Sequence, residues 1–156
     1  IATTILSTCF ASCTDSNKNS IETITKNPLT NSNAMNSYIS LVEIPANDLK
    51  RAVSFYESIL GIEIETMEMP DIQMGILHYE NQTVTVVITK AEGYKPSADG
   101  VTIYLNGGDN LQVILDKVES NGGKIVTPKT LHADESGYFA ILLDSEGNKI
   151  GLHSVN

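Results

Sequence analysis

Apolar and polar residues follow two different periods along the chain from residue 38 onward. Residues 38–46 alternate with a period of two, which is typical of a strand with one buried face. In residues 49–60 the apolar positions recur every three or four residues, which predicts an amphipathic helix. Asn47 or Asp48 is suited to cap the start of this helix, and Gly61 is suited to end it. Three further strands are expected at residues 62–69, 74–80 and 83–89.

The same order of one strand, one helix and three strands occurs a second time. A strand at 100–106 precedes a helix that Asp109 or Asn110 would cap and that Gly122 would end. Strands at 124–130, 137–143 and 148–154 follow this helix. The two similar halves indicate an internal repeat of roughly 60 residues with βαβββ order. The predicted domain covers residues 38–156, with modules at 38–90 and 100–154 and a link at 91–99.

Each predicted helix can cover only one face of the sheet in its own module. Two such modules side by side would form an incomplete barrel of the α+β class, with their open faces lining a shared cleft. The period of two places on the helix-covered faces Val42, Ile44, Ala46, Val84, Val86, Ile88, Val101, Ile103, Leu105, Ile150 and Leu152. It places on the cleft faces Leu41, Glu43, Pro45, Thr83, Thr85, Val87, Thr102, Tyr104, Asn106, Lys149, Gly151 and His153.

The charge of the chain limits the function classes. The 156 residues carry a formal net charge of −9, so phosphate backbones and anionic membrane surfaces would be repelled. The sequence also has no basic stripe, no Walker loop and no zinc-type pairing of cysteines. We therefore expect no nucleic-acid partner.

Residues 1–37 differ from the rest of the chain. A short apolar run precedes a stretch rich in Ser, Thr and Asn, which predicts a signal-like remnant followed by a disordered linker. Residues 10–13 (FASC) resemble a bacterial lipoprotein processing site, which makes Cys13 a candidate for lipidation and membrane anchoring. The favoured interpretation is a cell-envelope lipoprotein. The alternative is a disordered extension, with Met35 as the functional start of a cytoplasmic protein.

Three stretches of the domain carry a family resemblance. They are IPANDLKRAVSFYESILG (44–61), GGDNLQVILDKVESNGGKIV (107–126) and DSEGNKIGLHS (144–154). Together they resemble the vicinal oxygen chelate superfamily, which includes glyoxalase I, the bleomycin and fosfomycin resistance proteins and the extradiol dioxygenases. GYKPS, PKT and GLHS are similar to an uncharacterised glyoxalase-like subgroup of small bacterial proteins. The resemblance covers both modules and implies the fold described above.

The resemblance also implies where a metal ion would bind. In metal-dependent members, four strands each give one His, Glu or comparable ligand, and these positions correspond here to Leu41, Thr85, Thr102 and Gly151. A divalent ion needs imidazole or carboxylate ligands at about 2.0–2.2 Å. A threonine hydroxyl is a poor ligand, and leucine and glycine offer none. We therefore predict no metal cofactor, and we expect Gly151 to leave open space above its strand.

Glu43, Tyr104 and His153 lie two residues further along three of these strands and face the predicted cleft. In the catalytic interpretation, His153 is a general base, Glu43 is its charge partner or a proton shuttle, and Tyr104 supplies an orienting hydroxyl. One alternative is a structural Glu43–His153 ion pair covered by Tyr104, and another is a displaced metal site built from Glu43, His153 and a further donor. The predicted ligand-binding residues are Tyr104, Thr85, Thr102, Leu41, Gly151 and Asn106.

Four other polar residues are weaker candidates. His78 is expected on an outer strand as a surface or packing residue, and His132 in a loop that can cover the cleft. Lys95 and Lys129 would place positive charge at the cleft mouth for an anionic ligand, with solvated lysines as the alternative.

The preferred hypothesis is a small-molecule-binding protein with the glyoxalase and bleomycin-resistance fold and without the family's metal. The enzyme alternative is a glyoxalase-type lyase or isomerase that abstracts a proton next to a carbonyl with His153 or Glu43 as base, or a dioxygenase-related activity. A third possibility is a resistance protein that sequesters its ligand. For this class the resemblance implies a homodimer with clefts at the subunit junction.

Overall fold

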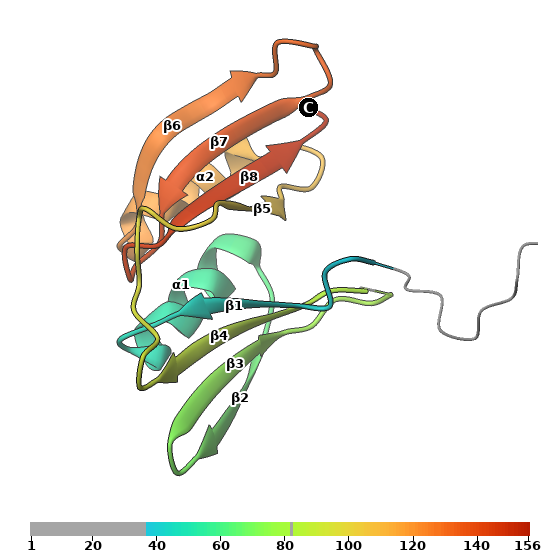
Figure 1. Ribbon diagram of the computed structural model, residues 1–156. Helices are drawn as coiled ribbons and strands as arrows, with labels where there is room; N and C mark the ends of the chain where they lie inside the picture. The colour runs from blue at the N-terminus through green and yellow to red at the C-terminus, as the bar shows by residue number, and fades with distance from the viewer. Residues whose placement is uncertain (1–36, 82) are drawn as a thin grey trace, which may run out of the picture. The chain divides into compact units, whose positions relative to one another are not determined.

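The computed structural model describes residues 37–81 and 83–156 (Figure 1). The predicted lipidation residue Cys13, and the predicted signal-like remnant and linker up to residue 36, lie outside the described residues. In the part of the chain that is described, no helix has the length and apolar character needed to cross a membrane.

The first module has the predicted order of elements. It consists of β1 (Leu41–Pro45), α1 (Leu49–Leu60), β2 (Ile64–Met69), β3 (Ile72–Leu77) and β4 (Thr85–Ala91). The strands form one sheet in the order β1-β4-β3-β2, in which β1 is parallel to β4 and the other pairs are antiparallel. Asp48 caps α1, because its carboxylate accepts a hydrogen bond from the Arg51 N–H at 3.1 Å. Gly61 ends α1 with a φ of 68°, the left-handed conformation that glycine adopts readily.

The second module repeats this topology. It consists of β5 (Ile103–Asn106), α2 (Gln112–Val118), the 3₁₀ helix η1 (Glu119–Asn121), β6 (Lys124–Leu131), β7 (Tyr138–Leu143) and β8 (Lys149–Ser154). Its sheet has the order β5-β8-β7-β6, with β5 parallel to β8. The two matching sheets confirm the predicted repeat and the α+β class.

Two sequence-based boundaries in the second module were wrong. Leu111, not Asp109 or Asn110, is the N-cap of α2, although the Asn110 side chain still accepts a hydrogen bond from the Gln112 N–H at 3.1 Å. Val101 was expected in the core but is 91% exposed, because β5 begins only at Ile103.

The core confirms most of the predicted strand faces. Ile44, Ile88 and Leu152 are at most 1% exposed, and they belong to one buried cluster with side chains of both helices. On the opposite face of sheet one, Val87 is 6% exposed and is therefore buried as well. The period of two thus identified which residues share a face, but it did not indicate how much of the second face is covered.

Hydrogen bonds connect the first module to the turn between β7 and β8. The Tyr56 hydroxyl donates to Asp144 Oδ2 at 2.8 Å in a buried contact. Burial, followed by the charge of Asp144, holds the pKa of Tyr56 well above its ordinary value. Arg51 donates to both carboxylate oxygens of Glu146, through Nε at 2.7 Å and through Nη2 at 3.1 Å. These contacts hold α1 against the β7–β8 turn.

Candidate functional site

A pocket of about 370 Å³ is lined by β1, the link, the start of β5 and the start of β8. The core residues Ile44 and Ile150 contribute to its lining, and they are 1% and 2% exposed. The other lining residues are Ile39, Val42, Glu43, Pro45, Lys95, Ser97, Gly100, Val101, Ile103, Asn148 and Lys149. Both halves of the repeat therefore contribute to one pocket with mostly apolar walls.

Asn148 brings the walls of this pocket together. Its side-chain oxygen accepts a hydrogen bond from the Ser97 N–H of the link at 3.1 Å. Its side-chain nitrogen donates to the Pro45 carbonyl of β1 at 2.8 Å and to Asp144 Oδ2 at 2.9 Å. Asn148 is 5% exposed, so these hydrogen bonds are shielded from water. One buried amide thus fixes the link and β1 against β8.

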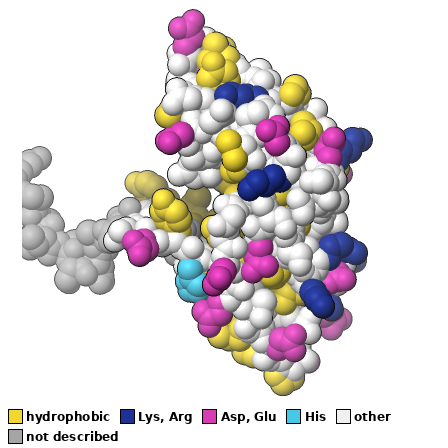
Figure 2. Space-filling view, turned by 180° about the vertical axis from the view of Figure 1, so that it is seen from behind, with side chains coloured by type: hydrophobic (Ala, Val, Ile, Leu, Met, Phe, Trp, Pro, Cys, Tyr) yellow, Lys and Arg dark blue, Asp and Glu magenta, His cyan; other side chains and the backbone are white. Residues whose placement is uncertain are grey.

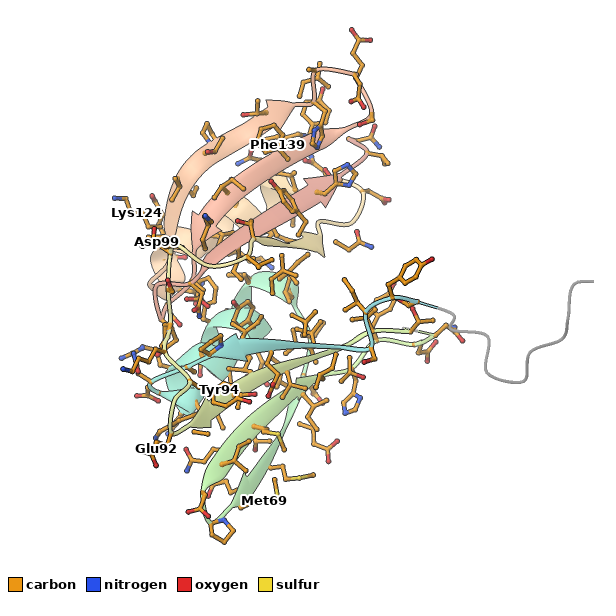
Figure 3. The ribbon with its side chains drawn as sticks, in the orientation of Figure 1. Met69, Glu92, Tyr94, Asp99, Lys124 and Phe139 are labelled. Carbon is orange, nitrogen blue, oxygen red and sulfur yellow. The ribbon has the colours of Figure 1, made fainter. Side chains whose placement is uncertain are left out.

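Glu43 lines the pocket, and its carboxylate accepts one hydrogen bond from its own module and one from the link. Thr89 Oγ1 donates to Glu43 Oε1 at 2.9 Å, and the Tyr94 hydroxyl donates to Oε2 at 3.0 Å. The hydrogen bond to this carboxylate, together with its negative charge, raises the pKa of Tyr94. Figure 3 shows Tyr94 on the link that leaves β4.

The predicted pairing of Glu43 with His153 is not formed. Within residues 37–81 and 83–156, the ion pairs join Arg51 to Glu146 and His78 to Glu65. The structural interpretation of a Glu43–His153 ion pair was therefore wrong, and Glu43 is not placed as a charge partner of His153. The carboxylate of Glu43 instead accepts hydrogen bonds from Thr89 and Tyr94, which were not among the predicted site residues.

Tyr104 occupies the space above Gly151. The two residues are direct partners on the parallel strands β5 and β8, so they face the same side of sheet two. A Cβ added to Gly151 would lie 2.5–2.7 Å from three ring atoms of Tyr104. The expectation of open space above Gly151 was therefore wrong, because the aromatic ring of the neighbouring strand packs directly on the glycine.

His153, two residues after Gly151 on β8, lies in an aromatic cluster on the same face. The rings of His153 and His132 have their centroids 5.3 Å apart, and the centroid of the His132 ring is 4.8 Å from that of Phe139 on β7. Asn106 is the β5 partner of His153. The structure thus brings the two histidines together and separates them from Glu43.

The four positions at which the family resemblance places metal ligands do not carry side chains that fit a divalent ion. Leu41 and Thr85 are direct partners on β1 and β4, and Thr102 precedes β5. None of these three, nor Gly151, carries an imidazole or a carboxylate. Among the described residues there is also no group of three or more His, Cys, Asp and Glu side chains arranged to hold an ion. The alternative of a displaced site is not supported either, since Glu43 and His153 do not meet.

The predicted site residues are thus divided between two places. Glu43 lines the pocket, whereas the pocket lining does not include Leu41, Thr85, Thr102, Tyr104, Asn106, Gly151 or His153. Lys95 is exposed and lines the pocket, whereas Lys129 donates to Asn110 Oδ1 at 2.8 Å and lies over the Tyr138 ring. His78 is exposed beside Glu65.

The predicted site residues did not include Thr89, Tyr94, Asn148 or Lys149. The period of two along β4 places Thr89 on the same face as Thr85, so this signal was present in the sequence. Lys149 was assigned to the open face without a role. Tyr94 lies outside strands and helices, where periodicity gives no information about side-chain direction. Asn148 was expected to begin a strand but lies just before β8.

Comparisons with known proteins agree with this architecture. Residues 38–152 match the family model of the Glyoxalase/Bleomycin resistance protein/Dioxygenase superfamily. A glyoxylase-like domain-containing protein of Didymella fabae is 28% identical over 123 residues, which are 73% of this chain and 91% of that protein.

Solved structures of the same fold include a mutant of glyoxalase I from Zea mays and an antibiotic-binding protein from Streptomyces sp. CB03234. The maize structure has a TM-score of 0.61 at 21% identity and matches 74% of this chain but only 46% of its own length. The Streptomyces structure has a TM-score of 0.57 at 19% identity and matches 76% of this chain and 95% of its own length. The family match covers most of the chain, and the chain belongs to the glyoxalase/bleomycin resistance protein/dioxygenase superfamily.

Proposed function

We propose that this protein binds a small organic molecule in the pocket between its two modules and does so without a metal ion. The observation that supports the proposal is the pocket itself, with walls from both halves of the repeat and a small number of polar groups. Mostly apolar walls with few polar groups are typical of small-molecule sites. A protein of the same fold is described as antibiotic-binding, which agrees with this class of function.

The metal-free part of the proposal is supported by the side chains at the expected ligand positions. Leu41 and Gly151 have no donor atoms, and the Tyr104 ring packs on Gly151. A metal-dependent activity would need ligands that these positions do not supply. For this reason glyoxalase-type catalysis through His153 or Glu43 stays a prediction without structural support, and a binding function is preferred.

Binding can be tested with a neutral fluorescent probe of apolar pockets, N-phenyl-1-naphthylamine. Val101 lines the pocket and is 91% exposed, so Val101→Trp should fill the pocket without disturbing the core. We expect this variant to lose probe binding. Val126→Trp is the matched control, because Val126 is 54% exposed on β6 and does not line the pocket. Equal binding by both variants would contradict the proposed site.

The role of metal can be tested on the same probe. Dialysis against a chelator should leave the affinity unchanged, and adding back Zn²⁺, Ni²⁺ or Mn²⁺ should not increase it. Binding that is lost on chelation and restored by one of these ions would contradict a metal-free site.

The homodimer also remains a proposal, supported by the family resemblance. Light scattering of the full chain would measure its mass, and a mass of 16.9 kDa would contradict the dimer.

A further inference from the structure

We infer that the ligand of this pocket is an amphipathic anion, with a carboxylate or similar acidic group on an apolar body. The inference rests on the proposed function, because it specifies the chemistry of the molecule that the same pocket binds. It follows from three features of the lining: two cations without acidic partners, a single carboxylate, and mostly apolar walls.

The cations are Lys95 on the link and Lys149 at the start of β8. In the described part of the chain, ion pairs within 4.0 Å join Arg51 to Glu146 and His78 to Glu65, so neither lysine has a carboxylate partner. The chain has 10 Lys and Arg against 19 Asp and Glu. Two unpaired lysines around one pocket of such an acidic protein provide a local attraction for a negative group.

One acidic residue, Glu43, also lines the pocket. Both carboxylate oxygens of Glu43 accept hydrogen bonds, one from Thr89 and one from Tyr94. Thr89 is 0% exposed, whereas Glu43 itself is exposed. Glu43 keeps its negative charge, but the lining carries two lysine ammonium groups and one carboxylate, so positive charge outnumbers negative charge around the pocket.

The walls favour an apolar body. Ile39, Val42, Ile44, Val101, Ile103 and Ile150 all line the pocket. The side chain of Asn148 is no polar anchor for the ligand, because its oxygen and nitrogen are bonded to Ser97, Pro45 and Asp144. The ligand body therefore gains from apolar contact and finds few groups to satisfy hydrogen-bonding atoms.

Three compounds of nearly equal shape test the inference by displacement of bound N-phenyl-1-naphthylamine. They are 4-phenylbutyrate, 4-phenylbutanamide and 4-phenylbutylammonium. We expect the carboxylate to bind about tenfold more tightly than the amide, as a charge-assisted contact allows, and the ammonium compound to bind most weakly. Raising the salt concentration should reduce the difference between carboxylate and amide.

A Lys95→Gln/Lys149→Gln double variant should lose the preference for the carboxylate and still bind the neutral probe. Lys124→Gln is the matched control, because Lys124 is exposed on β6 outside the pocket lining, and it should keep the preference (Figure 3).

These experiments distinguish a failure of the proposed ligand class from a failure of the proposed binding function. Suppose that the unaltered protein binds the probe, that Val101→Trp abolishes this binding, and that all three compounds displace the probe equally. The proposed function would then stand, and the anionic ligand class would be overturned. A preference that survives in the double variant would also overturn it. Absence of probe binding to the unaltered protein would instead overturn the proposed function.

Discussion

The Tyr104 ring packs on Gly151 at the centre of the open face of module two. It therefore limits which side chains position 151 can carry. A metal-binding side chain at position 151 would need the volume that the Tyr104 ring occupies, since even a Cβ would approach the ring to 2.5 Å. Glycine here is therefore explained by the aromatic neighbour on β5. Its backbone requires no positive φ, so alanine would be acceptable if the ring were absent.

This explanation predicts strong coupling between the two positions. Gly151→Ala alone should lower the free energy of unfolding by about 1–3 kcal/mol, because the ring and the strand must move apart. In a Tyr104→Ala background the same change should be neutral or slightly stabilising, as expected for Gly→Ala in a compatible conformation. Urea denaturation of the four proteins in a double-mutant cycle measures the coupling. Equal destabilisation in both backgrounds would show that the ring is not responsible.

Glu146 provides a prediction about pH. Burial alone would raise the pKa of its carboxyl group, but hydrogen bonds from Arg51 and from the Asp48 and Asn47 N–H groups outweigh burial and hold the pKa below the ordinary 4.5. A carboxyl whose pKa is lowered by folding stabilises the folded state above its unfolded pKa, and this contribution is lost as the pH falls through the folded pKa.

Glu146→Gln should therefore lower the free energy of unfolding at pH 7 by about 1–2 kcal/mol. The difference from the unaltered protein should shrink as the pH falls below 4.5, the ordinary value for this group. Denaturation between pH 3 and pH 7 measures this, with Glu63→Gln as a control on an exposed carboxylate. A difference between the two proteins that does not change with pH would contradict the role of the Glu146 charge.

At the level of elements, the two helices and most strand faces were predictable from the sequence. Apolar periodicity identified α1 and the buried faces of β1, β4, β5 and β8 because burial of one face requires that period. The start of β5 was not predictable, since Val101 has the right residue type but lies before the strand. The partners of Glu43 were also missed, because one of them, Tyr94, lies on the link where no period applies.

The junction between α1 and the β7–β8 turn gives a prediction at this scale. Tyr56→Phe keeps the buried ring but removes the hydroxyl that donates to Asp144 Oδ2, which then retains only the hydrogen bond from Asn148. We expect a loss of about 1–2 kcal/mol in the free energy of unfolding. Tyr79→Phe is the control, because Tyr79 is 76% exposed, and it should change stability by less than about 0.5 kcal/mol. Equal stability of the two variants would contradict a structural role for the Tyr56 hydroxyl.

At the level of the whole molecule, the internal repeat was the strongest signal for the fold, and the resemblance carried by residues 44–61, 107–126 and 144–154 predicted the family correctly. The location of the candidate site was only partly predictable. The residues that face one side of each sheet were identified, but the pocket forms where β1, the link and β8 are joined by Asn148, and this long-range contact leaves no local pattern. Acidic and basic side chains are interspersed on the face in Figure 2, and that face offers no broad basic surface for nucleic acid.

The most direct test of the central claim is methyl NMR of the full chain titrated with N-phenyl-1-naphthylamine. The account predicts that the largest shifts occur at the pocket methyl groups of Val42, Val101, Ile103 and Ile150 and that a chelator does not change them. Shifts concentrated at Leu41, Thr85 and Thr102, the positions at which the family resemblance implied metal ligands, would contradict it.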